Sequence, residues 1–571
     1  MADGSGYVFV TGALGRVFYN GLVGPPAKTT GLRYWMLRVL HECDRAAAGF
    51  GADPVHDLRV SLRRCRSMAD GMMAMDPDPD WKALKKAGKR LFQSLGQLRD
   101  VQIMMQWIEK LHPQLEVVSS PALPEAAETS AAAPDTVSAP APELGPHDPA
   151  TNALLHILRS RESQEKHAAR AALDEFDRKQ WRQWAKSLPL RAAHIRPGSA
   201  VFRHLALERW TAARELHIRA MRNRSQVALH TLRIGIKRFR YIVENFLPTE
   251  HKLWSNDLKH MQDLLGDVHD LDVLWATALS CRVFSDEASR RAWRARIAEE
   301  RTRRIDEYRQ RTVGPDSLWN VWRTGLPQGK QIQQIATRRM KLWAKALDPD
   351  PVHSEHVARL ALELYDGLEA TGLMGPLNES MNGSAADARS ALYVAALLHD
   401  VGKAKGNKGH HKESQELIKA HGTPLGWDAE TMQRAAVVAR FHAGALPVRS
   451  HKALRDLLPG EQKMIVRLAA ILRLANAFDA AHDGHIRSVK IENAFAQTKN
   501  RARRTNGFLR QAAVLGKNEA LVIGAEGYAA ASPTAQTIAA ERYLLETVLR
   551  RPVVVKQLTL HSTSVRAVHS Q

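Results

Sequence analysis

The stretch VHDLRVSLRRCRS runs from Val55 to Ser67, and a second stretch, LHTLRIGIKRFRY, runs from Leu229 to Tyr241. In each, a histidine is followed by cationic residues at intervals of three, four and three positions. At 3.6 residues per turn, these positions fall within an arc of roughly 80° on one helix face. Apolar residues repeat on a neighbouring stripe, so each stretch is predicted to be a helix with one buried edge and one cationic edge. The cationic edges are His56, Arg59, Arg63 and Arg66 in the first stretch and His230, Arg233, Lys237 and Arg240 in the second.

The similarity extends beyond these stretches. LGQLRDVQI from Leu95 matches LGDVHDLDV from Leu265, with His269 where the first copy has Arg99. Two copies of a helical unit about 170 residues apart predict a duplicated helical domain with pseudo-twofold symmetry. A cationic helix face is commonly only a solvated surface. The same row in both copies, each led by a histidine, favours a shared polyanion-binding face. Two further pairs of lysines match, Lys82 with Lys252 and Lys89 with Lys259.

Composition supports an anionic partner. The formal net charge of the 571 residues is +22 and the isoelectric point is about 10.0. Such a charge favours nucleic acid, polyphosphate or an anionic membrane surface as partner. The three cysteines have no metal-ligand spacing, which indicates a reducing, cytoplasmic location. No stretch is long and apolar enough to predict a membrane span.

The predicted fold is mainly α-helical. Residues 1–29 are expected to be a leader, and residues 30–325 a duplicated helical bundle. A Pro- and Ala-rich segment at about 118–150 interrupts the bundle and is predicted to be disordered. Residues 331–485 are expected to form a second, all-helical domain. Residues 486–571 contain short β-branched runs and predict a small α+β region.

The second domain contains a candidate metal site. The segment ALLHDVGK places His399 and Asp400 side by side after an apolar helix, a pair that can bind one divalent ion or bridge two. Most adjacent His-Asp pairs are incidental, but further histidines and carboxylates occur in separate segments that a helical bundle can bring together. Such a site suits metal-assisted hydrolysis of a phosphoester or phosphoanhydride, with Lys403 placed to hold phosphate.

Four segments of this domain resemble the HD-domain metal phosphohydrolase superfamily: HSEHVARLALELY from His353, ALLHDVGKAKGNKGHHKESQELI from Ala396, ARFHAG from Ala439, and ILRLANAFDAAH from Ile471. The resemblance is greatest to the helical C-terminal domain of exopolyphosphatase and guanosine pentaphosphate phosphohydrolase proteins. It implies a divalent metal (Mn, Mg, Fe or Zn), with His399, Asp400 and Lys403 as the catalytic residues. The implied metal-binding positions are His353, His399, Asp400, His410, His411, His442, Asn476 and Asp479. Asn476 stands where the superfamily usually has aspartate, and Asp479 is a possible substitute.

The N-terminal repeat, in turn, resembles the CHAD domain, the conserved histidine α-helical domain, over about residues 30–325. The resemblance implies a duplicated bundle whose basic groove binds inorganic polyphosphate. The groove residues that it implies are His56, Arg59, Arg63, Arg66, Lys82, Lys89, Arg99, His230, Arg233, Lys237, Arg240, Lys252 and Lys259.

Three functions remain open at this point. The first is a polyphosphate-binding protein with a metal-dependent phosphohydrolase acting on polyphosphate or a phosphorylated nucleotide. The second is a non-enzymatic protein associated with polyphosphate granules, which Asn476 favours. The third is a general polyanion or RNA binder. Aromatic residues make up only 6% of the chain and none lies within the first row, which counts against base stacking and makes nucleic acid the less favoured partner.

Overall fold

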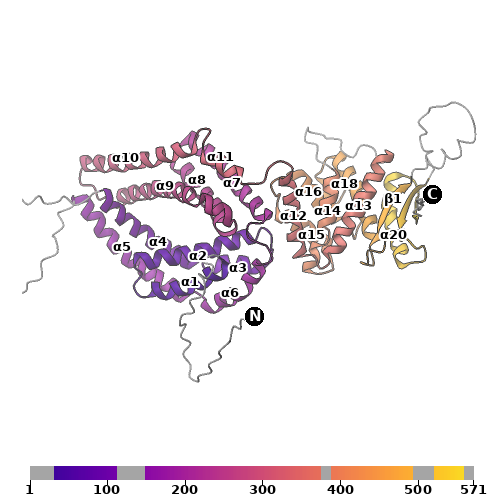
Figure 1. Cartoon of the computed structure of the whole chain (residues 1–571), viewed down its shortest axis with the longest axis horizontal. Helices are drawn as coiled ribbons and strands as arrows, with labels where there is room; N and C mark the ends of the chain where they lie inside the picture. Colours follow the sequence, from indigo (N-terminus) through magenta and orange to yellow (C-terminus); the bar gives the residue numbers. More distant parts are fainter. Residues whose placement is uncertain (1–30, 112–147, 374–387, 493–519, 559–571) are drawn as a thin grey trace, which may run out of the picture.

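The computed structural model describes residues 31–111, 148–373, 388–492 and 520–558 (Figure 1). The predicted leader and nearly all of the predicted insertion lie outside these residues. The insertion was expected to extend to residue 150, but a helix begins at Pro149. The reason is local, because the Asp148 carboxylate caps that helix by accepting from the backbone N–H groups of Ala150 and Thr151.

The first domain consists of two halves (Figure 1). The first half contains α1 (Leu32–Ala47), α2 (Ala52–Met72), α3 (Pro79–Ala87), α4 (Lys89–Leu111), α5 (Pro149–Asp174) and α6 (Arg178–Ala192). The second half contains α7 (Ala200–Asn223), α8 (Gln226–Phe246), α9 (Pro248–Ser280), α10 (Glu287–Thr312) and α11 (Leu318–Thr324). The two repeated stretches therefore lie on α2 and α8, as the periodicity predicted.

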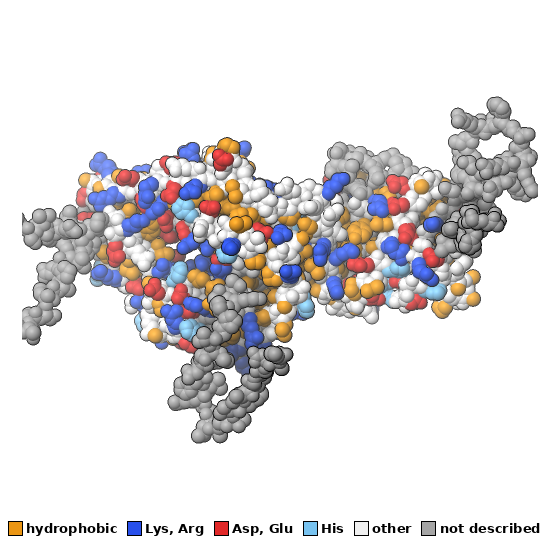
Figure 2. All heavy atoms as spheres, viewed as in Figure 1, with side chains coloured by type: hydrophobic (Ala, Val, Ile, Leu, Met, Phe, Trp, Pro, Cys, Tyr) orange, Lys and Arg blue, Asp and Glu red, His pale blue; other side chains and the backbone are white. Residues whose placement is uncertain are grey.

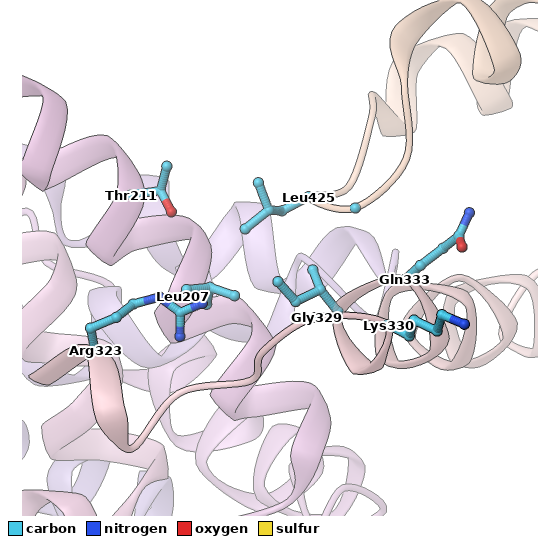
Figure 3. A pocket seen from close by; sticks show the side chains of 9 residues that line it. Leu207, Thr211, Arg323, Gly329, Lys330, Gln333 and Leu425 are labelled. Carbon is cyan, nitrogen blue, oxygen red and sulfur yellow. The ribbon is translucent and has the colours of Figure 1, made fainter. Parts of the chain in front are cut away.

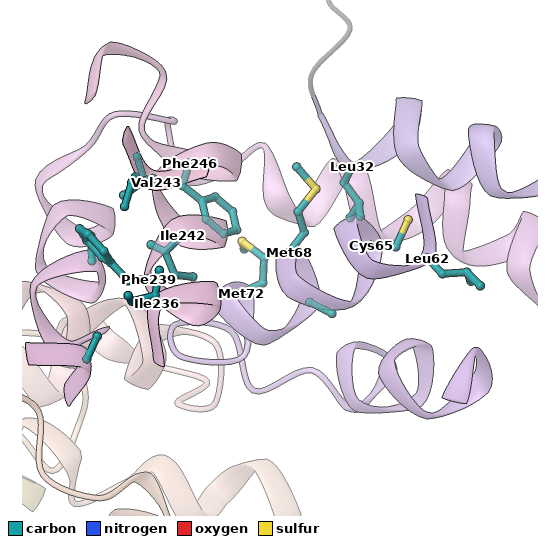
Figure 4. Close-up of a cluster of buried hydrophobic side chains, with 14 of the residues drawn as sticks. Leu32, Leu62, Cys65, Met68, Met72, Ile236, Phe239, Ile242, Val243 and Phe246 are labelled. Carbon is teal, nitrogen blue, oxygen red and sulfur yellow. The ribbon is translucent and has the colours of Figure 1, made fainter. Parts of the chain in front are cut away.

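The halves meet along two helix pairs, α2 with α8 and α4 with α9. Figure 4 shows the first contact, where Met68 and Met72 of α2 lie beside Ile242 and Phe246 of α8. Gly71 permits this approach, because a Cβ at that position would collide with the Phe246 ring. The buried edges of both repeats thus form one shared core. The cationic edges are left together on another side of the same helix pair.

The second domain begins with helices around a separate core. These are α12 (Gln331–Lys345), α13 (Pro351–Thr371), α14 (Ala388–Leu398), the 3₁₀ helix η1 (Val401–Lys405), α15 (His410–His421), α16 (Ala429–Arg440), α17 (Lys452–Arg455) and α18 (Pro459–Phe478). α14 is nearly all apolar and buried along most of its length, so it forms the centre of the bundle.

The expected α+β region follows and packs onto this bundle. It contains β1 (Ser488–Glu492), β2 (Leu521–Glu526), α20 (Pro533–Leu549) and β3 (Val553–Gln557). The strands form one sheet in the order β1-β2-β3, antiparallel between β1 and β2 and parallel between β2 and β3. Its buried side chains, such as Ile523 and Leu545, belong to the same core as the helices. The region is therefore part of the second domain rather than a separate unit.

A buried polar contact joins the two domains between α7 and α12. His204 Nε2 donates to the Leu425 carbonyl at 2.8 Å, and Glu208 accepts from the Leu425 N–H at 3.0 Å. Arg339 of α12 pairs with Glu208 at 2.8 Å. A cavity of about 570 Å³ lies beside this contact and is lined from both domains, by side chains that include Leu207, Thr211, Arg323, Lys330 and Gln333 (Figure 3). No helix in the described parts of the chain is long and apolar enough to cross a membrane.

Candidate anion groove and metal site

The cationic rows of α2 and α8 converge. Lys237 of α8 is close enough to Arg63 and Arg59 of α2 for their charges to lower its pKa. Burial is the larger cause, and together with Arg233 these effects lower the pKa of Lys237 to about 7. The two halves therefore contribute cations to one shared cluster, at the position of the predicted groove. Figure 2 shows that Lys and Arg elsewhere on the drawn face are interspersed with Asp and Glu, so net charge by itself does not mark this site.

The groove contains guanidinium groups that lack partners. Buried nitrogens of four arginines make no hydrogen bond to any described residue: Arg59 Nη1, Arg63 Nε, Arg66 Nη1 and Arg233 Nε. None of these four side chains is within 4.0 Å of a carboxylate in the described ranges. A buried donor without a partner costs about 1–3 kcal/mol, and more when the group is charged. An incoming anion would remove this penalty by accepting from these N–H groups.

Two aspartates that the sequence analysis did not select also border the groove. Asp100 and Asp270 occupy matching positions of the repeat. Partial burial raises the pKa of both, to about 6 for Asp270, even though Arg233 and Lys237 act in the opposite direction. The repeated Leu-Gly-x-x-x-Asp pattern was a signal for these positions. The groove is therefore not uniformly cationic.

The remaining predicted groove residues differ in their surroundings. Arg99 is near His56 and helps to lower the pKa of that histidine, although burial is the larger cause. Arg240 is 3.6 Å from Glu244, so it is partly neutralised. Burial raises the pKa of Asp263, and the nearby charges of Arg240 and Lys259 act in the opposite direction. Lys82, Lys89 and Lys252 are exposed, and none of their ammonium groups makes an ion pair with a described residue. His230 is 3.3 Å from His269 through their Nδ1 atoms, and burial lowers the pKa of both rings, to about 4 for His269.

In the second domain, one cluster contains His353, His399 and Asp400, all buried. His399 Nε2 is 3.4 Å from Asp400 Oδ2, and His353 Nε2 is 4.0 Å from the same oxygen. His399 Nε2 is buried and has no hydrogen-bond partner among the residues described. Since His353 lies in the first turn of α13 and the His-Asp doublet follows α14, packing of these two helices creates the cluster.

A second cluster shares Asp400 with the first and adds His410 and His442. His410 Nε2 and His442 Nε2 lie 3.4 and 3.5 Å from Asp400 Oδ1, and 2.9 Å from each other. The two carboxylate oxygens of Asp400 therefore face different sets of histidines. This geometry is that of a carboxylate able to bridge two cations.

The residues fit divalent cations. Ligands of a cation held at about 2.1 Å are about 3.0–3.4 Å apart in octahedral or tetrahedral geometry, close to most of the separations in the two clusters. Three rings donate from Nδ1 to backbone carbonyls, which leaves Nε2 as the metal-binding atom. These donations are His399 to Ala396 at 2.7 Å, His410 to Asn407 at 2.8 Å, and His442 to Ala439 at 2.7 Å.

The other predicted ligands have different positions. Asn476 Oδ1 is 3.0 Å from His353 Nε2 and therefore lies at the edge of the first cluster. Asp479 accepts from His353 Nδ1 at 2.7 Å and from the Gly484 N–H at 2.9 Å. Each of its oxygens accepts one hydrogen bond, and through the first of them Asp479 orients the His353 ring. His411 also lies outside both clusters, with its ring against Gly444.

Lys403 forms an ion pair with the aspartate of the His399-Asp400 doublet. Its Nζ donates to Asp400 Oδ2 at 2.6 Å. Burial by itself would raise the pKa of Asp400, but His399, His442 and Lys403 together lower it below its usual value. Burial also lowers the pKa of His399 and His442, which favours the neutral, metal-binding form of both rings.

Two positioning features escaped the sequence analysis. Gly402 lets η1 lie against the start of α15, because a Cβ there would collide with the His410 carbonyl. Arg473 of α18 donates to the carbonyls of Phe441 and Gly444, both at 3.2 Å, and thereby holds the segment that carries His442. An arginine inside the apolar segment LAAILRLA of α18 was the signal that could have found it.

The comparisons with known proteins agree with this division into two domains. Residues 36–279 match the CHAD domain, and residues 335–519 match Ppx/GppA phosphatase, domain III. The crystal structure of the CHAD domain from the plant Ricinus communis is similar at 19% identity and a TM-score of 0.31, covering 52% of this chain and 88% of that chain. No curated protein matches the chain. Residues 36–279 are therefore similar to CHAD domains, and residues 335–519 are similar to domain III of Ppx/GppA phosphatases.

Proposed function

We propose that this protein binds inorganic polyphosphate in the groove between α2 and α8. The observation that carries the proposal is the convergence of unpaired guanidinium groups from both halves around Lys237. Polyphosphate has about one charge per phosphate and no base edges, so it is recognised by charge and spacing, as a nucleic-acid backbone is. The CHAD match and the Ppx/GppA match together support a polyphosphate-related function.

The second domain is proposed to be a metal-dependent phosphohydrolase acting on polyphosphate or a phosphorylated nucleotide. His353, His399, Asp400, His410 and His442 would hold divalent ions. Such ions, when bound, lower the pKa of a bound water and neutralise phosphoryl oxygens. The chain's own contribution is to fix the rings through their Nδ1 donations and to exclude bulk water by burial. Lys403 supplies an ammonium group beside Asp400 that can pair with a phosphoryl oxygen of the substrate.

A second candidate function is polyphosphate binding without hydrolysis, for example as a protein of polyphosphate granules. The position of Asn476 favours it, because a neutral amide faces His353 where a carboxylate would bind the cation more strongly. A third candidate, general binding of polyanions including RNA, is less favoured. Arginines lie over the rings of Phe92 and Tyr241, so the faces that they cover are not free to stack on bases.

One experiment separates these functions. The full chain is titrated with long-chain polyphosphate at fixed salt, challenged with RNA at equal phosphate concentration, and assayed for phosphate release with Mg²⁺ or Mn²⁺. We expect retention of polyphosphate that RNA does not displace, and release that depends on metal. Equal displacement by RNA would indicate a general polyanion binder. Binding without release, by protein that takes up no metal, would indicate the non-enzymatic protein.

Polyphosphate binding is also expected to strengthen as pH falls. The pKa of Lys237 is about 7 in the free groove and should rise beside a polyanion, so the bound state takes up a proton. Affinity should therefore increase about tenfold from pH 8 to pH 6 by linkage. Asp270 has a pKa of about 6, and its protonation removes a negative charge beside the polyanion, so it should increase the affinity further at lower pH. Dissociation constants measured across this range check the prediction.

Lys237→Arg is the matched variant for this test, because arginine remains charged throughout the range. This variant should bind polyphosphate more tightly than the unmodified chain at pH 8, and its affinity should change less between pH 8 and pH 6. A wild-type affinity that is constant between pH 8 and pH 6 contradicts the proposed contact with Lys237.

A further inference from the structure

Three arginines of the first row lie over aromatic rings. The guanidinium carbons of Arg59 and Arg66 are 5.1 and 5.2 Å from the centre of the Phe92 ring, which comes from α4. Arg63 lies 5.4 Å from the ring of Tyr241, which comes from α8 in the other half. Arg59 and Arg66 are seven residues apart, so they project from the same face two turns apart and lie over one ring.

The way these arginines are supported matters for anion binding. A guanidinium held by a carboxylate uses its N–H groups and is neutralised, whereas one held over an aromatic face keeps its charge and its in-plane donors. Arg64 on the same helix differs in its polar partners: its guanidinium carbon lies 4.9 Å from the centre of the Trp35 ring, but the group also pairs with Glu244 and donates to Asn245 at 3.3 Å. Arg59, Arg63 and Arg66 have no such partner in the described residues, and each keeps a buried nitrogen without a hydrogen bond.

The aromatic support is not symmetric between the halves. The repeat aligns Phe92 with Gln262, whose Oε1 is buried without a partner, and aligns Tyr241 with Ser67. Among the described residues, no aromatic ring lies under Arg233 or Arg240, and Arg240 instead approaches Glu244 at 3.6 Å. Aromatic rings therefore support the arginines of the first row, whereas those of the second row have no such support among the described residues.

We propose that Phe92 and Tyr241 are positioning residues of the polyphosphate groove, which hold Arg59, Arg63 and Arg66 extended with their donors free. This inference rests on the proposed binding of polyphosphate. The rings touch no phosphate themselves. They act by holding three guanidinium groups in place before the anion arrives, which lowers the ordering cost of binding.

The test compares Phe92→Leu, which removes the ring, with Phe92→Tyr, which keeps it. Phe284→Leu is the matched control, because Phe284 is a half-buried ring of the same domain that packs on Trp275 and Trp293 at 5.7 and 5.9 Å, far along the chain from the row. Each variant of the full chain is titrated with long-chain polyphosphate at several salt concentrations, and its thermal midpoint is recorded.

We expect Phe92→Leu to weaken binding roughly tenfold, because two cation–π interactions are removed. The slope of log affinity against log salt should fall by about one for each phosphate group that the arginines no longer neutralise. Phe92→Tyr should retain affinity and slope, and Phe284→Leu should lower only the thermal midpoint. If the unmodified chain fails to bind polyphosphate, the proposed function itself is wrong. If it binds and Phe92→Leu binds equally well with the same slope, the positioning role alone is refuted.

Discussion

Replacing Arg59, Arg63, Arg233 and Lys237 together by alanine should abolish retention of long-chain polyphosphate. These four cations come from both halves and act on one another across the groove. A hydrogen bond to a charged group contributes about 1.5–3 kcal/mol, so even with strong non-additivity we expect at least a roughly thousandfold loss of affinity. Filter retention and titration at fixed salt measure the effect.

The control for this variant changes the same number of charges elsewhere in the domain. Alanine at the exposed positions Arg182, Arg219, Arg222 and Arg238 lowers the net charge equally and leaves the groove intact. It should weaken binding only slightly, through the long-range field. Equal losses in the two variants would show that net charge alone, and not the groove, retains the polyanion.

The quadruple variant should also be more stable than the unmodified protein. The unmodified groove holds like charges close together and leaves buried nitrogens without partners, and both features are destabilising. Removing them should raise the thermal midpoint while binding is lost. An increase of this kind is typical of functional sites, where residues are selected for the ligand at the expense of the free protein.

Asp400→Asn is expected to remove all tightly bound divalent metal, whereas His442→Ala should remove only part of it. Asp400 contributes one oxygen to each cluster, but His442 belongs to only one. If the unmodified chain binds two ions, His442→Ala should retain one and Asp400→Asn none, with loss of any metal-dependent phosphate release in both. Metal content after dialysis, measured by elemental analysis, checks the stoichiometry.

Asp456→Asn is the matched control for this change, since Asp456 is an exposed carboxylate of the same domain whose side chain is 76% accessible. Its metal content should equal that of the unmodified chain. If Asp400→Asn keeps its full metal content, the two clusters are not the binding site. Polyphosphate binding should be unchanged in Asp400→Asn, because the groove lies in the other domain.

Much of the architecture follows from local pattern. The 3.6-residue periodicity of the two repeated stretches determined that His56, Arg59, Arg63 and Arg66 share one helix face, and α2 shows this. The duplication determined that α8 would present a matching row. The His399-Asp400 doublet identified the centre of the two candidate metal clusters, because a short motif specifies which groups are adjacent along a chain.

Contacts between distant segments were decided only by the tertiary structure. The packing of α2 on α8 brings Arg63 over Tyr241, and the approach of α4 places Phe92 under Arg59. In the second domain, Asp479 at the end of α18 accepts from His353 Nδ1 and orients that ring, and Asn476 of α18 lies beside His353 Nε2. Periodicity fixes the face from which a side chain leaves its helix. Which partner it meets depends on how helices remote in sequence fill a common core, and that is a property of the whole fold.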